Sequence, residues 1–84
     1  MYTLEYSKQA ARALMRMPSN TSATIRTKLL ELAQDPLAAR NVKKLTEHPG
    51  YRLRVGDWRI IYLLDNGKFI VYVVEIGARG GVYK

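Results

Sequence analysis

The first half of the chain carries its hydrophobic residues at helical spacing, and this constrains the fold more than any other feature of the sequence. They recur every three or four positions, so each set lies on one face of a helix. Pro18 and Pro36 interrupt the pattern, because proline is not tolerated inside a helix. The spacing predicts amphipathic helices over residues 8–17 and about 22–35, joined by a short polar turn at residues 19–21. Their apolar faces are formed by Ala10, Leu14 and Met17 in the first helix and by Ile25, Leu29, Leu32 and Ala33 in the second.

The second half of the chain has strand patterns separated by turn signals. Hydrophobic residues alternate with arginines over residues 51–55, and residues 58–64 are rich in aromatic and β-branched side chains. Gly56-Asp57 and Asp65-Asn66-Gly67 are typical of tight turns. Residues 68–76 follow as a nearly continuous apolar strand, which is typical of a central position in a sheet or of a strand covered on both faces.

A short strand over residues 1–6 completes the expected order, which is β-α-α-β-β-β. Two helices joined by a short turn need a sheet to cover their apolar faces. We therefore expect one α+β domain over residues 1–84, with the helix hairpin packed on a twisted, mostly antiparallel sheet of about four strands. Much of its core should come from Ile25, Leu29, Leu32, Leu53, Ile60 or Ile61, Val71 and Val73.

Composition excludes several classes of site. With no cysteine and one histidine, the chain lacks the ligands of a thiolate zinc site or a multi-histidine metal centre. It has no phosphate-binding loop of the GxxxxGK[ST] type and no HExxH motif. We therefore expect no metal and no small-molecule cofactor. The longest apolar run, residues 69–74, is too short for a membrane span, and the start does not resemble a signal peptide, so we expect a cytoplasmic protein without a membrane partner.

The charge balance points to polyanionic partners. The chain has 14 lysines and arginines against 7 acidic residues, a net charge of +7, which favours RNA, DNA or an acidic protein without choosing among them. Much of the excess lies between residues 40 and 59. The basic residues of this segment are Arg40, Lys43, Lys44, Arg52, Arg54 and Arg59.

The arginines of the strand segments have both ordinary and functional interpretations. Arg52 and Arg54 share one face of their strand, because side chains alternate, and that face could simply be solvated. Arg59 lies in an otherwise apolar strand, so its charge needs a partner. That partner could be Asp57 or Glu75 in an ion pair, or a phosphate at the mouth of a groove.

Three further residues are weaker candidates. Arg79 lies between glycines, which would let the backbone pass close to a ligand but also suits a flexible terminus. Tyr83 could stack on a base, donate its hydroxyl hydrogen or pack the tail against the domain. His48 is a lone histidine in a loop, and such residues seldom do chemistry.

Three stretches together resemble the RelE/ParE toxin superfamily, and specifically its RelE-type branch. They are NVKKL from Asn41, PGYRLRVGDWRIIY from Pro49, and IGARGGVYK from Ile76, and the resemblance covers essentially the whole chain. It implies a toxin of a type II toxin–antitoxin system that enters the ribosomal A site and cleaves mRNA. The partners it implies are a cognate antitoxin, the ribosome and mRNA.

The resemblance also implies roles for individual residues. The paired strand lysines of RelE-like proteins fall on Arg52 and Arg54, and arginine, unlike lysine, cannot accept a proton in a reaction. The acidic and histidine pair of other branches has no clear counterpart unless Glu75 or His48 serves. The implied catalytic residues are Arg59, Arg79 and Tyr83, and the implied substrate-binding residues are Arg52, Arg54, Lys43 and Lys44.

The chemistry of RNA is compatible with this residue set. If the ribose 2′-hydroxyl attacks the adjacent phosphate, the protein needs only to align the groups, stabilise the developing charge and assist proton transfer. Arginines could stabilise the charge, and a tyrosine near guanidinium groups could act as the base. Two alternatives remain: a ParE-like inhibitor of DNA gyrase, and a non-catalytic RNA-binding or ribosome-binding module in which Arg79 and Tyr83 need not be close together.

Overall fold

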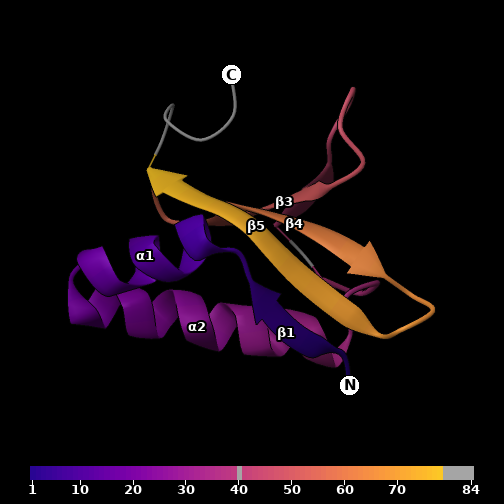
Figure 1. Cartoon of the computed structure of the whole chain (residues 1–84), viewed down its shortest axis with the longest axis horizontal. Helices are drawn as coiled ribbons and strands as arrows, with labels where there is room; N and C mark the ends of the chain where they lie inside the picture. The colour runs from indigo at the N-terminus through magenta and orange to yellow at the C-terminus, as the bar shows by residue number, and fades with distance from the viewer. Residues whose placement is uncertain (40, 79–84) are drawn as a thin grey trace.

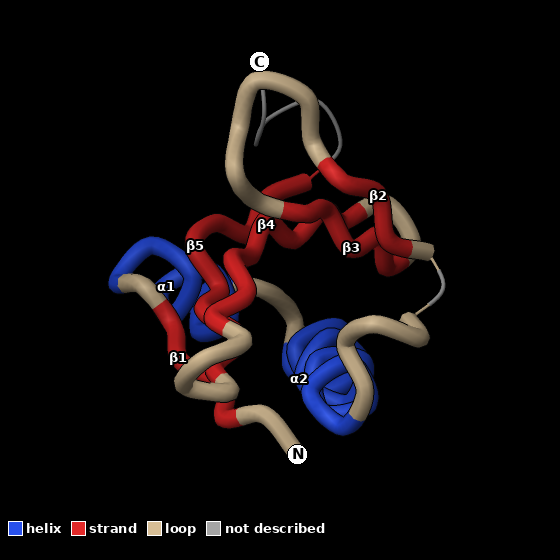
Figure 2. The backbone as a smooth tube through the Cα atoms, turned by 90° about the vertical axis from the view of Figure 1, so that its right-hand side faces the viewer, coloured by secondary structure: helices blue, strands red, loops and turns tan. Residues whose placement is uncertain are grey.

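Two helices cover one face of a five-stranded sheet in the computed structural model, which describes residues 1–39 and 41–78 (Figure 1). Figure 2, in which α2 is seen end-on, shows β3 and β4 passing above that helix. The α+β class and the helix hairpin on a sheet are as predicted. In chain order the elements are β1 (Thr3–Tyr6), α1 (Lys8–Arg16), α2 (Ser19–Gln34), β2 (Val42–Lys44), β3 (Tyr51–Val55), β4 (Trp58–Asp65) and β5 (Ile70–Ala78).

The strands lie in the order β1-β5-β4-β3-β2, so the last strand in sequence is inserted beside the first. β1 runs parallel to β5, and the other neighbouring pairs are antiparallel. The sheet has one strand more than expected. The added strand, β2, is only three residues long and contains two lysines, so no hydrophobic alternation marks it in the sequence.

The helices begin and end close to the predicted positions. Ser7 caps α1, because its side-chain oxygen accepts a hydrogen bond from the Ala10 N–H at 3.1 Å. The connection to α2 is shorter than predicted, since α2 begins at Ser19 directly after Pro18. The expected polar turn at residues 19–21 is the first turn of this helix, where such residues are well tolerated. None of the helices in the two described ranges is long and apolar enough to cross a membrane.

The core lies between the helices and the sheet, and every residue predicted for it is buried. Ile25 and Leu29 of α2 pack against the inner face of the sheet, where Val71 and Val73 of β5 are fully buried. Ile60 and Ile61 are both buried, although alternation along β4 directs them to opposite faces of the sheet. Ile60 belongs to the core that faces the helices. Ile61 therefore lies on the opposite face of the sheet, which also has an apolar residue near its centre.

A β-bulge in β5 changes which side chains face the helices. Ile61 of β4 pairs with Glu75, but the next residue, Tyr62, pairs with Val73, so Val74 is an extra residue on β5. Val73 before the bulge and Ile76 after it are both buried in the core. Regular alternation from Val73 would have directed Glu75 toward the core. The bulge instead directs Glu75 to the opposite face and Ile76 inward.

Two side chains from the start of α1 bind the backbone of β5 at the bulge. β1 has ended at Tyr6, and the Ser7 N–H and hydroxyl then donate to the carbonyl oxygens of Val73 and Val74 at 2.9 and 2.5 Å. The Gln9 amide bonds both backbone groups of Ile76: it donates to the carbonyl oxygen and accepts from the N–H, each at 2.9 Å. These bonds replace the neighbouring strand that β5 lacks beyond Val73.

Replacing Gln9 with alanine should destabilise the protein by about 2 kcal/mol, because two backbone groups of Ile76 lose their partners at a part-buried position. Urea denaturation measures the change. Gln34→Ala, at an exposed position near the end of α2, is the matched control and should change stability by no more than ~0.5 kcal/mol. Equal stability of the two variants would contradict the role assigned to Gln9.

Candidate functional site

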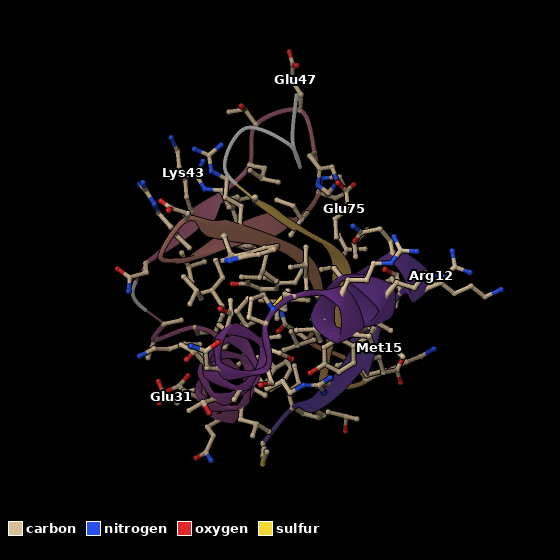
Figure 3. All side chains as sticks on the ribbon, turned by 90° about the vertical axis from the view of Figure 1, so that its left-hand side faces the viewer. Arg12, Met15, Glu31, Lys43, Glu47 and Glu75 are labelled. Atoms are coloured by element: carbon tan, nitrogen blue, oxygen red, sulfur yellow. The ribbon has the colours of Figure 1, made fainter. Side chains whose placement is uncertain are left out.

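The strand register gathers basic side chains on the face of the sheet away from the helices, called the open face below. Lys43 of β2 is the direct cross-strand partner of Arg52, and Arg54 is the partner of Arg59 on β4. Leu53, between the two arginines, is buried in the core, so its neighbours on β3 point to the open face. Figure 3 shows Lys43 and Glu75 on this side of the sheet. The cationic cluster consists of Lys43, Arg52, Arg54 and Arg59.

A groove of about 420 Å³ is lined by three members of this cluster, Lys43, Arg52 and Arg54. Its wall includes the side of β3 that carries Arg52 and Arg54, and the adjoining part of β2 with Lys43. Asn41 and Gly56, at the ends of these strands, both have positive φ angles, of 53° and 59°, so the backbone turns sharply at this end of the groove. An open groove lined by three cations suits a phosphodiester chain.

The cations of the cluster have no carboxylate partner within the described part of the chain. Neither Asp57 nor Glu75 forms an ion pair with Arg59 within 4 Å, so the structural explanation considered for this arginine does not apply. The Nε atom of Arg52 is buried and has no hydrogen-bond partner among the described residues. Unpaired guanidinium groups that face a groove are available to bind an anion.

The two adjacent lysines of β2 are separated by strand alternation. Lys43 lies on the open face, whereas Lys44 pairs with Tyr51 and shares the other face of the sheet with Val42. The register thus brings Lys43 but not Lys44 to the cationic cluster. The alternation could have indicated this division, but only after residues 42–44 had been recognised as a strand.

The tail candidates lie outside the described residues. These are Arg79 and Tyr83, and Arg40 of the basic segment also falls there. The described part of β5 ends at Ala78, and Gly77 pairs with Arg59. Gly77 has no side chain, so the space beside Arg59 on the open face is not filled by its cross-strand partner.

Other titratable groups near the sheet have structural roles. The Nδ1 atom of His48 accepts a hydrogen bond from the Gly50 N–H at 2.9 Å, which closes the loop before β3. Tyr62 is buried on the core face, and its burial, together with the stacked ring of Tyr51, raises its pKa well above the usual value for a phenol. Tyr62 therefore stays protonated and does not reach the open face.

No cluster of three or more His, Cys, Asp or Glu side chains within residues 1–39 and 41–78 is arranged to hold a metal ion. The chemistry available on the open face is that of fixed positive charge. One carboxylate, that of Glu75, lies in the same cross-strand row as Ile61, Arg52 and Lys43. The sequence suggested Glu75 chiefly as an ion-pair partner, because its position on the open face depends on the bulge.

Comparison with known proteins identifies the family. The family model described as ParE toxin of type II toxin–antitoxin system, parDE, matches residues 4–83. The chain belongs to this family. Among curated relatives, the mRNA interferase toxin RelE of Escherichia coli K12 is 23% identical over 79 residues, which cover 93% of this toxin and 83% of that protein.

Solved structures show the same fold. The RelE–RelB complex of Pyrococcus horikoshii contains a chain with a TM-score of 0.82 and 25% identity, covering 95% of this toxin and 97% of that chain. The matching chain of RelBE2 from Mycobacterium tuberculosis has a TM-score of 0.81 and 25% identity, and the match covers 93% of this toxin and 98% of that chain. The matching chain of RelBE from E. coli has a TM-score of 0.80 and 23% identity, and the match covers 93% of this toxin and 96% of that chain. The toxin thus belongs to the RelE-type branch of the RelE/ParE superfamily and to a type II toxin–antitoxin system.

The cationic cluster should lower the stability of the free toxin at low salt, because like charges directly opposite on neighbouring strands repel each other. We expect Arg54→Gln to raise the melting temperature by about 1–5 °C at low ionic strength, which corresponds to roughly 0.2–1 kcal/mol. The gain should shrink at about 0.5 M NaCl, where charges are screened. Lys68→Gln removes the same charge from an exposed turn and should have a smaller effect; equal effects would contradict local repulsion.

Proposed function

We propose that this toxin is a metal-independent endoribonuclease that cleaves mRNA in the ribosomal A site. The observation that carries the proposal is the unpaired cationic cluster around a groove on the open face. Curated relatives named mRNA interferase support it, although they are only 23% identical to this chain. The cytoplasm is where such a toxin would meet ribosomes.

The proposed reaction uses the nucleophile that RNA itself supplies. The 2′-hydroxyl attacks the adjacent phosphorus, the bond to the 5′ oxygen breaks, and a 2′,3′-cyclic phosphate and a 5′-hydroxyl result. In this scheme Arg52, Arg54 and Lys43 hold the phosphates along the groove, and Arg59 stabilises the charge that develops on the scissile phosphate. This assignment leaves out Lys44, which faces the other side of the sheet.

The tail residues complete the proposed site. Arg79 would add a second guanidinium at the scissile phosphate, and Tyr83 would stack on a base or take part in proton transfer. Both roles come from the resemblance to RelE-like proteins.

A cognate antitoxin is the second proposed partner. Several solved relatives with the same fold come from toxin–antitoxin complexes. A chain of net charge +7 with an open cationic groove favours an acidic or amphipathic segment laid across that groove. Such a segment would neutralise the cluster and block access of RNA.

A pull-down with the protein encoded beside the toxin gene tests the proposed antitoxin partner. Absence of binding would contradict that proposal.

Inhibition of DNA gyrase is the second candidate function, because the matching family model is named for ParE. Primer extension on a defined mRNA, with and without ribosomes, distinguishes mRNA cleavage from gyrase inhibition. Cleavage that occurs only with ribosomes and leaves cyclic phosphate ends supports the proposed function. Inhibited DNA supercoiling with intact mRNA would support the gyrase function instead.

Replacing Arg59 with glutamine should slow single-turnover mRNA cleavage by roughly 10²–10³, the effect of one lost charge-stabilising donor. Stability should not fall, because Arg59 has no ion pair with a described carboxylate and faces the like charge of Arg54. Arg59→Lys should recover part of the rate, since lysine keeps the charge but loses the fork of donors. Arg26→Gln on α2 is the control; a parental cleavage rate for Arg59→Gln would refute the assignment.

The same experiment can be made at Arg79. We expect Arg79→Ala to change stability by no more than ~0.5 kcal/mol, as is usual for a surface substitution, and to slow cleavage by roughly 10²–10³. Melting temperature, ribosome affinity and cleavage rate should be measured on this variant and on Arg79→Lys. A variant that cleaves normally, or that fails only because it unfolds, would exclude Arg79 from the reaction.

A further inference from the structure

Glu75 is a carboxylate placed at the margin of the cationic cluster by the bulge in β5. It lies on the open face opposite Ile61, and the next pair along the two strands on this face is Arg59 with Gly77. Arg59 and Glu75 are therefore diagonal neighbours on adjacent strands. Such residues are ~7–8 Å apart at their Cα atoms, and long side chains can bridge or flank the space between them.

The carboxylate is half-buried and has no partner among the described residues. It forms no ion pair within 4 Å and no hydrogen bond to another described side chain or backbone group. A carboxylate beside several guanidinium groups would normally pair with one of them. Gly77, the cross-strand partner of Arg59, has no side chain, so a group bound on the open face could contact both Arg59 and Glu75.

The proposed cleavage also needs a proton acceptor that the cationic cluster cannot provide. Arginine stays protonated, so Arg52, Arg54 and Arg59 do not accept the 2′-hydroxyl proton. His48 uses Nδ1 to hold the Gly50 N–H in the loop before β3. Tyr62 is buried on the other face, where burial raises its pKa. Among the described residues of the central open face, Glu75 is the group with free lone pairs beside Arg59.

We propose that Glu75 is the general base of this toxin, an inference that rests on the proposed ribonuclease function. Its carboxylate accepts the proton of the 2′-hydroxyl while Arg59 contacts the phosphate that this hydroxyl attacks. In RNA the 2′-hydroxyl and the attacked phosphate belong to adjacent groups of one nucleotide. A base and a cation on diagonal positions can therefore contact both at once.

The step balances without a metal or a further cofactor. The O2′–H proton passes to Glu75, a bond forms between O2′ and phosphorus, and the bond between phosphorus and O5′ breaks. The leaving O5′ takes a proton from water. Glu75 then loses its proton to water and returns to the carboxylate. The products are the 2′,3′-cyclic phosphate and the free 5′-hydroxyl.

Charged groups on the surrounding elements set the conditions for this role. On the open face Glu75 is flanked by Arg59 of β4 and, further across, by Arg52 and Arg54 of β3 and Lys43 of β2. β1 carries Glu5 on the same face, where it pairs with Tyr72, and α1, which packs along β5, carries Lys8 and Arg12. The charge that surrounds Glu75 is thus predominantly positive.

Glu75→Gln tests the proposal, because it keeps the shape of the side chain and removes its ability to accept a proton. We expect a folded variant that binds mRNA-programmed ribosomes at least as tightly as the parent, since a negative charge is lost beside the cations. Single-turnover cleavage should be slower by roughly 10²–10⁴. The parental rate should rise with pH where proton transfer to the base limits cleavage, and this rise should be absent in Glu75→Gln. Glu75→Asp should retain part of the rate.

Glu5→Gln is the matched control, with the same change of charge on the same face of the sheet but on β1. It should cleave at the parental rate. Parental cleavage or an unchanged pH profile in Glu75→Gln would overturn the role of Glu75 and leave the proposed function standing. If Glu75→Gln lost ribosome binding or melted well below the parent, its role would be structural. If the parent itself failed to cleave mRNA with ribosomes, the proposed function and this inference would both fall.

Discussion

The bulge in β5 and the side chains that hold it determine how the two halves of the molecule fit together. Ser7 and Gln9 follow shortly after β1, and their bonds to Val73, Val74 and Ile76 join the start of α1 to β5. The same Ser7 oxygen caps α1. Because the extra residue reverses the alternation, Ile76 completes the core on one face and Glu75 enters the open face on the other.

The sheet separates two kinds of surface by a single layer of backbone. Its inner face packs Leu53, Ile60 and Val73 against the helices and supplies the hydrophobic stabilisation of the domain. Its open face holds like charges at direct cross-strand positions, an arrangement that opposes folding. The core thus supports a cluster whose like charges are unfavourable in the free protein. Binding of an anion, as proposed above, would relieve this repulsion.

The cluster also defines how this toxin differs from the pattern that its sequence resembles. The resemblance to RelE-like proteins implies lysines at two strand positions where this chain has Arg52 and Arg54, and arginine, unlike lysine, cannot accept a proton in a reaction. In the proposed reaction, phosphate binding and proton transfer are therefore assigned to different residues. The proposal for Glu75 follows from this division, and it places the proton acceptor on β5 and the charge-stabilising residues on β3 and β4.

The sequence by itself determined the elements that depend on local patterns: the two helices with their apolar faces, the hairpin over residues 51–65, and the shared face of Arg52 and Arg54. Local spacing and turn residues encode these features directly. The tertiary structure alone decided the strand β2, the division of Lys43 from Lys44, and the position of Glu75. Each depends on pairing between distant strands. Along Val71–Ile76 apolar residues occupy both faces, so no alternation in the sequence marks where the register shifts.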